Sequence, residues 1–231
     1  MQTPDIILRN SEQDLKSLLL RQRTIRPRFS WPLPFEQARK LLTAAYMAEV
    51  EYRARRPSLD TTTLDNISRL ASALTSPEPS FGIMLCGLCG NGKTTMLYAL
   101  RQATNLLQSQ GQFAPIEQQG ISVGMRIADA REIAELATTD RRQFQAVKRT
   151  YILGIEDMGR EPTEVLDYGN ILNPIVDILE HRYNEQLFTA ITTNLTPKQI
   201  RDKYGVRIAD RFNEMMQVII FTNPSFRTPQ Q

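Results

Sequence analysis

A glycine-rich segment that ends in Lys-Thr is the part of this sequence best suited to chemistry on a phosphate. From Gly87 to Thr94 it matches the pattern G-x-x-x-x-G-K-[ST]. An apolar run precedes the segment and a helical pattern follows it, as this kind of loop requires. Glycines let backbone N–H groups turn toward a phosphate, and the helix N-terminus adds partial positive charge. The predicted binding residues are Gly87, Gly90, Asn91, Gly92, Lys93, Thr94 and Thr95.

Two side chains at the end of this loop predict its ligand. The ammonium of Lys93 should reach the β- and γ-phosphates of a nucleoside triphosphate. The hydroxyl of Thr94 should coordinate the Mg²⁺ ion that accompanies those phosphates. We therefore expect ATP and Mg²⁺ as cofactors.

A pair of acids follows a short apolar run and could complete the metal site. Residues 151–155 read as a buried strand, with Glu156 and Asp157 at its tip. Carboxylates in that position are costly unless a cation or hydrogen bonds compensate them. A Mg²⁺ ion would do so, with Glu156 and Thr94 as its ligands, while Asp157 would polarise the attacking water. The alternative is an exposed turn with two ordinary acids.

Two further groups could act on the γ-phosphate. Asn194 follows a strand-like run, and an amide at a strand tip can orient the attacking water, with Thr193 as the second choice. A strand-to-helix turn would also favour Asn or Thr. Arg207 and Arg211 share one helix face, and a guanidinium suits the charge of a transferring phosphoryl group. Without further context, a solvated and salt-bridged helix face would explain these arginines better.

Strand and helix patterns alternate from residue 81 onward. Such alternation predicts an α/β fold, in which helices cover both faces of a parallel sheet. The predicted strands are 81–86, 121–127, 151–155, 187–192 and 218–221, and the predicted helices are 93–109, 130–137, 141–149, 171–183 and 200–216.

The first 75 residues read as a helical segment that precedes a core of residues 76–231. Helices are predicted over 11–21, 35–56 and 64–74. The segment could bind a partner or pack on the core. Its run from Arg21 to Trp31 mixes cations with aromatic side chains, as proteins that bind single strands do, although a solvated linker is the simpler interpretation.

Composition limits the partners and the environment. A net charge of +3 over 231 residues allows a nucleic-acid partner without arguing for one. No run approaches the roughly 20 apolar residues of a membrane span, and the N-terminus lacks a signal-peptide profile, so we expect a cytoplasmic protein. Cys86 and Cys89 are interpreted as small buried hydrophobes, because no second cysteine pair or histidine cluster completes a metal site.

The order and spacing of these motifs resemble those of the AAA+ ATPases of the DnaC/DnaI helicase-loader and IstB transposition-helper group. The resemblance covers residues 80–228. Its most specific pieces are IEDMG at 155–159, HRYNEQLFTAITTNL at 181–195, KYGVRIADRF at 203–212 and SFR at 225–227.

The resemblance implies a fold and a role for each motif. The fold would be a P-loop AAA+ core with a five-stranded parallel sheet of order 5-1-4-3-2, with little or no C-terminal lid and a helical N-terminal segment. The loop 87–94 would be Walker A, Glu156 and Asp157 Walker B, and Asn194 sensor 1. Arg211 would be an arginine finger, with Arg207 as its companion.

The implied function is that of an ATP-dependent DNA replication accessory, a replicative helicase loader. It would bind the helicase through residues 1–75, assemble as a homo-oligomer on ATP, and hydrolyse ATP between subunits. Single-stranded DNA would lie against the basic helix that carries Arg141, Arg142, Lys148 and Arg149.

Three alternatives remain. The first is an IstB-like transposition helper, with a transposase as partner, and the second is a nucleotide-gated switch that scarcely hydrolyses ATP. The third is a small-molecule kinase, which would need a substrate-binding insertion or an Arg-rich lid that the sequence does not show. The switch is motivated by Glu156, since the resembled group usually has Asp there, and this difference bears on hydrolysis more than on ATP binding.

Overall fold

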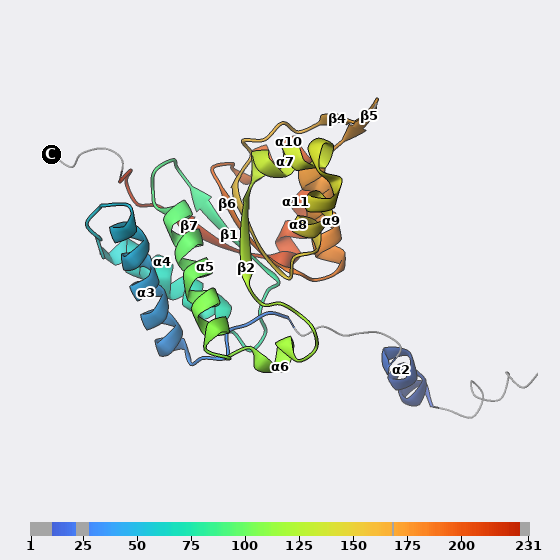
Figure 1. Ribbon diagram of the computed structural model, residues 1–231, viewed down its shortest axis with the longest axis horizontal. Coiled ribbons are helices and arrows are strands. Elements are labelled where there is room, and N and C mark those ends of the chain that lie inside the picture. The colour runs from blue at the N-terminus through green and yellow to red at the C-terminus, as the bar shows by residue number, and fades with distance from the viewer. Residues whose placement is uncertain (1–10, 22–27, 168, 227–231) are drawn as a thin grey trace, which may run out of the picture.

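A five-stranded parallel sheet runs through the centre of the molecule (Figure 1). The computed structural model describes residues 11–21, 28–167 and 169–226. The sheet consists of β1 (Gly82–Gly87), β2 (Met125–Asp129), β3 (Ile152–Met158), β6 (Phe188–Thr193) and β7 (Met216–Phe221). These strands lie in the order β2-β3-β6-β1-β7, and every neighbouring pair is parallel. Counted along the chain and read from β7, this is the expected order 5-1-4-3-2.

The parallel register brings the functional motifs to one edge of the sheet. The three central strands β3, β6 and β1 are largely buried on both faces, which explains the apolar runs of β1 and β3, whereas β6 also carries buried threonines. β1 ends in the glycine-rich loop, β3 carries the acidic pair near its end, and β6 runs into Asn194. Ligands of open parallel sheets bind at this carboxyl edge.

One face of the sheet is covered by three long helices (Figure 1). They are α3 (Phe35–Tyr52), α4 (Thr61–Leu74) and α5 (Lys93–Ser109), with the short α6 (Ala114–Glu117) after them. Leu42 of α3 and Ile67 of α4 are fully buried in the same cluster as Ile83 of β1. Much of the N-terminal segment therefore packs on the core, which was one of its two expected arrangements. The partner-binding role of residues 1–75 stays a prediction.

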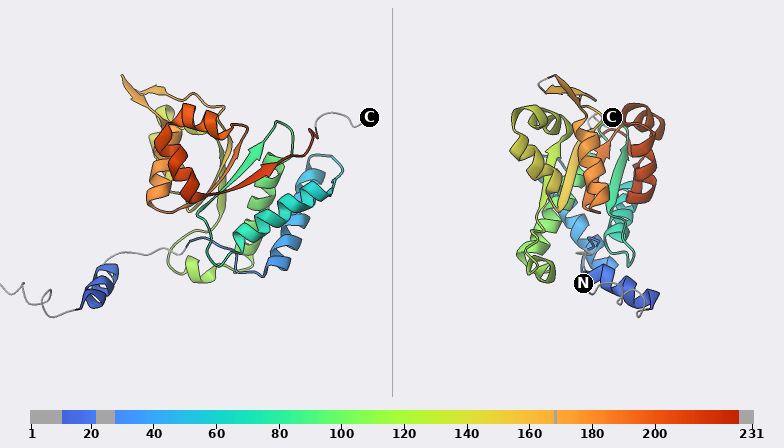
Figure 2. Two further views of the ribbon diagram at one scale, coloured as in Figure 1. Left: turned by 180° about the vertical axis from the view of Figure 1, so that it is seen from behind. Right: turned by 90° about the vertical axis from the view of Figure 1, so that its right-hand side faces the viewer.

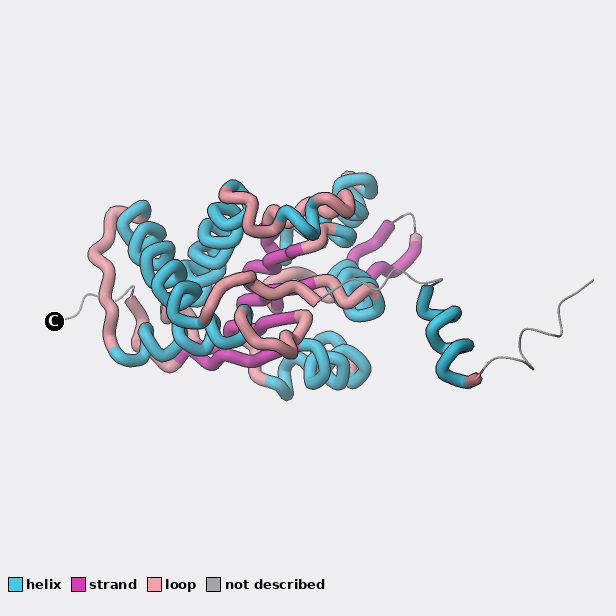
Figure 3. The backbone as a smooth tube through the Cα atoms, turned by 90° about the horizontal axis from the view of Figure 1, so that it is seen from below, coloured by secondary structure: helices cyan, strands magenta, loops and turns pink. Residues whose placement is uncertain are grey.

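The other face is covered by five helices (Figures 2 and 3). They are α7 (Ala130–Thr139), α8 (Arg141–Arg149), α9 (Pro174–Asn184), α10 (Pro197–Tyr204) and α11 (Val206–Met215). Leu153 of β3 and Ile191 of β6 are fully buried beneath them. The predicted helix 200–216 is divided by Gly205, whose φ of 86° ends α10 and lets α11 start in a new direction.

A hairpin replaces the start of the helix predicted over 171–183. Its strands are β4 (Val165–Asp167) and β5 (Asn170–Leu172), and it projects beyond the helices in Figure 2. Helix α9 starts only at Pro174, because a proline favours the first turn of a helix. The predicted strand 121–127 likewise begins later, at Met125.

The aromatic residues near the N-terminus belong to the core. Phe29 and Trp31 are buried in the cluster beneath α3, α4 and α5, and the ring of Phe29 packs against Phe188. The interpretation of these rings as a stacking surface for single strands is therefore wrong. Part of the run from Arg21 to Trp31, residues 22–27, lies outside the described residues.

The first described helix, α2 (Glu12–Arg21), differs from the others in exposing its apolar side chains. Ser11 caps it and exchanges hydrogen bonds with Asp14. None of its residues is buried, and Leu18, Leu19 and Leu20 are exposed. Among the described helices, none has the length and apolar content needed to cross a membrane.

Candidate functional site

The glycine-rich loop connects β1 to α5 and has the backbone that its glycines permit. Gly90 and Gly92 have φ values of 85° and 94°, in the left-handed region that favours glycine. A Cβ on Gly87 would lie 2.4 Å from the carbonyl oxygen of Phe221. Asn91 fastens the loop to β7, since its Nδ2 donates to that same carbonyl at 2.7 Å.

Lys93 lies inside the loop and is only 5% exposed. Its Nζ donates to the carbonyl oxygens of Gly87 at 2.8 Å and Leu88 at 2.7 Å, and to Oδ1 of Asn91 at 3.0 Å. The lysine is also the first residue of α5, where the helix end carries partial positive charge. A buried ammonium at a helix N-terminus suits a phosphate group.

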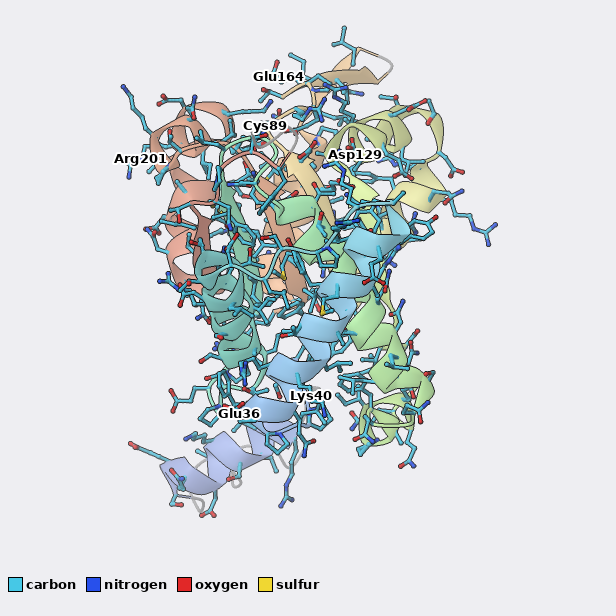
Figure 4. The ribbon with its side chains drawn as sticks, turned by 90° about the vertical axis from the view of Figure 1, so that its left-hand side faces the viewer. Glu36, Lys40, Cys89, Asp129, Glu164 and Arg201 are labelled. Atoms are coloured by element: carbon cyan, nitrogen blue, oxygen red, sulfur yellow. The ribbon has the colours of Figure 1, made fainter. Side chains whose placement is uncertain are left out.

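A cavity of about 820 Å³ opens beside the loop, a volume suited to a nucleotide. Residues 89–95 of the loop and helix line one wall, and Asp157 and Asn194 line another. The fold thus brings together the three motifs that the sequence placed in separate strands. In Figure 4, Cys89 of the loop and Asp129 at the end of β2 lie at one end of the molecule, opposite Glu36 and Lys40.

The remaining wall comes from residues that, apart from Phe226 of the SFR motif, were not singled out as site residues. They belong to the end of α3, to the segment after it and to the C-terminal segment: Tyr46, Val50, Arg53, Arg55, Arg56, Ser58 and Phe226. The backbone N–H of Phe226 donates to Gly90 O at 3.0 Å, and its carbonyl accepts from Arg55 at 3.3 Å. Two signals in the sequence could have found this wall: the run of arginines at the end of the predicted helix 35–56, and the SFR motif at 225–227. Arg227 lies outside the described residues.

The two acids of β3 have different partners. Asp157 has a φ of 53°, and its Oδ2 accepts from Nη1 of Arg160 at 2.5 Å, at the cavity wall. Glu156 Oε2 accepts a hydrogen bond from the hydroxyl of Tyr98 at 3.0 Å. Burial, and then the charge of Glu156, raise the pKa of Tyr98, so this phenol remains a donor at neutral pH.

The predicted Mg²⁺ ligands fit the ion by their chemistry. Thr94 and Glu156 offer a hydroxyl and a carboxylate oxygen, the hard donors that Mg²⁺ prefers. The nearby Asp157 adds a second carboxylate. Mg²⁺ is commonly held by one or two carboxylates together with substrate phosphates, and the loop would bring those phosphates beside Thr94.

At the end of β6, Asn194 and Thr193 have separate positions. Asn194 is exposed and lines the cavity, where its amide could contact a water or a phosphate. Thr193 is buried, and its hydroxyl donates to the carbonyl of Met158 at 2.7 Å. This hydrogen bond joins the ends of β6 and β3, so Thr193 fixes the strands while Asn194 faces the cavity.

The two arginines of α11 converge on one carboxylate. Nε of Arg207 lies 3.3 Å and Nη1 of Arg211 3.1 Å from Oε1 of Glu180. The side chain of Arg207 is 73% exposed, whereas that of Arg211 is 13% exposed and lies over the ring of Tyr183 at 4.7 Å. Neither arginine lines the cavity of its own chain.

The two cysteines differ from the expectation of two small buried residues. Cys86 in β1 is half-buried, and this burial raises the pKa of its thiol to about 11. Cys89 is exposed and lines the cavity, so its interpretation as a buried hydrophobe is wrong. The loop bulges outward after Gly87, where the local pattern of a strand no longer holds.

Comparison with known proteins defines the fold. Neither a protein-family model nor a curated protein matches the sequence. Among solved structures, the DnaC helicase loader matches with a TM-score of 0.51 at 19% identity, over 73% of this chain and 94% of its own. DnaI matches with a TM-score of 0.51 at 21% identity, over 85% of this chain and 95% of its own. The chain therefore has the α/β P-loop fold of the AAA+ proteins DnaC and DnaI.

Proposed function

We propose that this chain is a Mg²⁺-dependent ATPase that acts as a DNA replication accessory, loading a replicative helicase. One observation carries the proposal: the buried Lys93 of the glycine-rich loop, Asp157 and Asn194 surround a single nucleotide-sized cavity. The fold shared with the DnaC helicase loader supports the choice of partner.

Each of the predicted site residues has a defined task in hydrolysis. Lys93 neutralises charge on the β- and γ-phosphates, while Thr94 and Glu156 hold Mg²⁺, which draws charge from the same oxygens. Asp157 polarises the attacking water and Asn194 orients it. Because Asp157 is paired with Arg160, that ion pair must open or shift before the carboxylate can contact the water.

The missing positive charge is supplied by a second copy of the chain. Arg207 and Arg211 do not line the cavity of their own chain, and both contact Glu180. An arginine from a neighbour can stabilise the charge of the transferring phosphoryl group. In this arrangement Arg207 reaches the neighbouring site, and Arg211, held by Tyr183, fixes the shared Glu180. ATP bound between copies then favours a homo-oligomer.

The partner surface is the exposed side of α2. Leu18, Leu19 and Leu20 are solvent-exposed on a short helix, and exposed apolar side chains on a helix can enter a hydrophobic groove on another protein. Because α3 and α4 are part of the core, an isolated fragment 1–75 would expose their apolar faces. Capture of partners therefore needs the full chain, with Leu18→Ser/Leu19→Ser as its control.

The ATPase test compares wild type with Lys93→Ala. The wild type should bind and hydrolyse ATP in the presence of Mg²⁺, and Lys93→Ala should lose at least tenfold in ATP affinity because the charge inside the loop is gone.

Capture should recover a replicative helicase with the wild-type chain and lose it with the Leu18→Ser/Leu19→Ser variant. Recovery of a transposase would favour the IstB-like helper, and equal ATP binding by wild type and Lys93→Ala would contradict the proposal.

The nucleotide-gated switch is the second candidate, and the partners of the acids favour it. Asp157 is engaged by Arg160 and Glu156 by Tyr98, so one oxygen of each carboxylate already has a hydrogen-bond partner. A switch should bind ATP tightly and turn it over very slowly, and Glu156→Asp should raise its turnover. Robust turnover by the wild type would eliminate this candidate.

A further inference from the structure

Tyr98 of α5 links the acidic pair to the N-terminal helices. Its hydroxyl donates to Oε2 of Glu156 at 3.0 Å. Two guanidinium groups lie against its ring: Arg101 at 4.7 Å and Arg53 at 5.5 Å from the ring centroid. The ring thus has a defined position, and its hydroxyl has a defined acceptor.

The position of Tyr98 on α5 directs it toward the predicted metal site. Thr94 and Tyr98 are four residues apart, so they lie on one face of α5, a single turn from each other. On β3, Ile155 packs under the helices of the opposite face, so the next residue, Glu156, points toward α5. Tyr98, one turn from the predicted metal ligand Thr94, thus reaches the carboxylate of Glu156.

We propose that Tyr98 is a positioning residue for Glu156. The Tyr98 hydroxyl fixes one carboxylate oxygen and leaves the other to face the Mg²⁺ ion that Thr94 and the nucleotide would hold. A glutamate has one more rotatable bond than the aspartate usual in the resembled group, and the hydrogen bond removes that freedom. Groups that orient a metal ligand in this way alter metal affinity without touching the ion. The proposal rests on the ATP site proposed above.

The anchor of this arrangement lies in α3. Glu49 is 3% exposed, and its carboxylate accepts from Arg53 Nη2 at 2.9 Å and from Gln102 Nε2 at 2.6 Å. Arg53 is thereby held against the Tyr98 ring, and it also lines the nucleotide cavity. The contacts run from the end of α3 through Tyr98 to Glu156, so the N-terminal helices contribute to the geometry of the site.

The test uses Tyr98→Phe, which removes the hydroxyl and keeps the ring between its two arginines. A fluorescent ATP analogue is titrated onto the full chain at a series of Mg²⁺ concentrations. We expect the Mg²⁺ concentration for half-maximal tightening of nucleotide binding to rise about tenfold, the lower end for groups that orient a metal ligand. Affinity without Mg²⁺ should be unchanged, because the loop and Lys93 are intact.

Two controls separate positioning from a general structural role. Tyr52 lies beside the same two arginines and is 84% exposed. The variant Tyr52→Phe should leave the Mg²⁺ dependence unchanged. Combining Tyr98→Phe with Glu156→Gln should add nothing to the effect of Glu156→Gln alone, because Tyr98 acts through that carboxylate. Thermal melting checks that each variant is folded.

The outcomes distinguish this proposal from the proposed function. If the wild type binds the analogue and Tyr98→Phe has the same Mg²⁺ dependence, the role of Tyr98 is wrong and the ATPase stands. Additive effects of Tyr98→Phe and Glu156→Gln would also overturn it, since they would show that Tyr98 acts elsewhere. If the folded wild type does not bind the analogue, both proposals fail.

Discussion

The polar residues around the nucleotide cavity restrain one another. Lys93 is held by carbonyls of its own loop, Asp157 by Arg160, and Glu156 by Tyr98. A phosphate that contacts Lys93 would replace neutral acceptors by a charged one, and hydrogen bonds between charged groups are roughly twice as strong as neutral ones. At the residue scale, nucleotide binding would therefore exchange the hydrogen-bond partners of Lys93.

The two cysteines allow a prediction about occupancy of the loop. Cys89 is exposed at the cavity, whereas burial raises the pKa of the Cys86 thiol to about 11. The thiolate is the reactive form, so at pH 8 Cys86 is almost entirely the unreactive thiol. We expect N-ethylmaleimide to modify Cys89 first, and ATP with Mg²⁺ to slow that modification severalfold.

Mass spectrometry of the modified chain, digested after short exposures, checks this expectation. Cys89→Ser is the matched control and should remain almost unmodified over the same period. Equal modification of both cysteines would contradict the assigned burial, and a rate at Cys89 that ATP does not alter would argue against a nucleotide in this cavity.

The site residues that could be predicted from the sequence are those that belong to a short motif with fixed spacing. The glycines, Lys93 and the acids stand at fixed spacings within their own strand and loop. Tyr98 belonged to no such motif, and the SFR motif marked Phe226 without showing its contact, because their partners Glu156 and Gly90 lie far away along the chain. Contacts of that kind depend on how helices are placed, which periodicity does not determine.

Among the elements, α10 connects the loop after β3 to α11, the helix that carries Arg207 and Arg211. Lys203 at its end donates to the carbonyls of Gly159 at 2.9 Å and Glu161 at 2.6 Å. The buried carboxylate of Glu161 accepts from the hydroxyl of Tyr204 and from the backbone N–H of Gly159. The loop after β3 is thus joined by hydrogen bonds to Lys203 and Tyr204, directly before Gly205 and α11.

Helix α8 carries the prediction for DNA. Arg141, Arg142 and Arg149 are exposed, whereas Lys148 is 15% exposed and paired with Asp177 at 2.7 Å. Of the four cations expected to contact DNA, only the three arginines are therefore still expected to do so. Arg141→Glu/Arg142→Glu should weaken binding to single-stranded DNA and lower the salt slope by roughly 1.4, about 0.7 for each lost phosphate contact.

Fluorescence anisotropy across a series of salt concentrations measures that slope. Lys148→Met is the control, and it should leave the slope unchanged because its ammonium is already engaged by Asp177. An unchanged salt slope in the Arg141→Glu/Arg142→Glu variant would contradict the prediction that single-stranded DNA binds to α8.

Most elements were predicted to within a few residues because their periodic patterns are long. The hairpin β4–β5 was missed since its strands are three residues each, too short for alternation to register. Helix α9 was started too early for the same reason, as Ile171 and Leu172 resemble the apolar positions of the helix that follows.

At the scale of the whole molecule, the proposed ATPase site would draw on two separate parts of the chain. The cavity with Lys93 and Asp157 opens at the carboxyl edge of the sheet, and Arg207 and Arg211 lie outside it on α11. A site completed between copies would use both parts. An isolated copy should then be a poor ATPase.

Mixing two inactive variants tests this central claim most directly. Lys93→Ala retains the arginines of α11 but lacks the loop cation, and Arg207→Ala/Arg211→Ala retains the loop but lacks those arginines. Each alone should hydrolyse ATP at least tenfold more slowly than wild type. In an equimolar mixture, contacts that join the intact loop of one to the intact arginines of the other should restore a substantial part of the activity. A mixture no more active than the mean of its two components would contradict a site shared between copies.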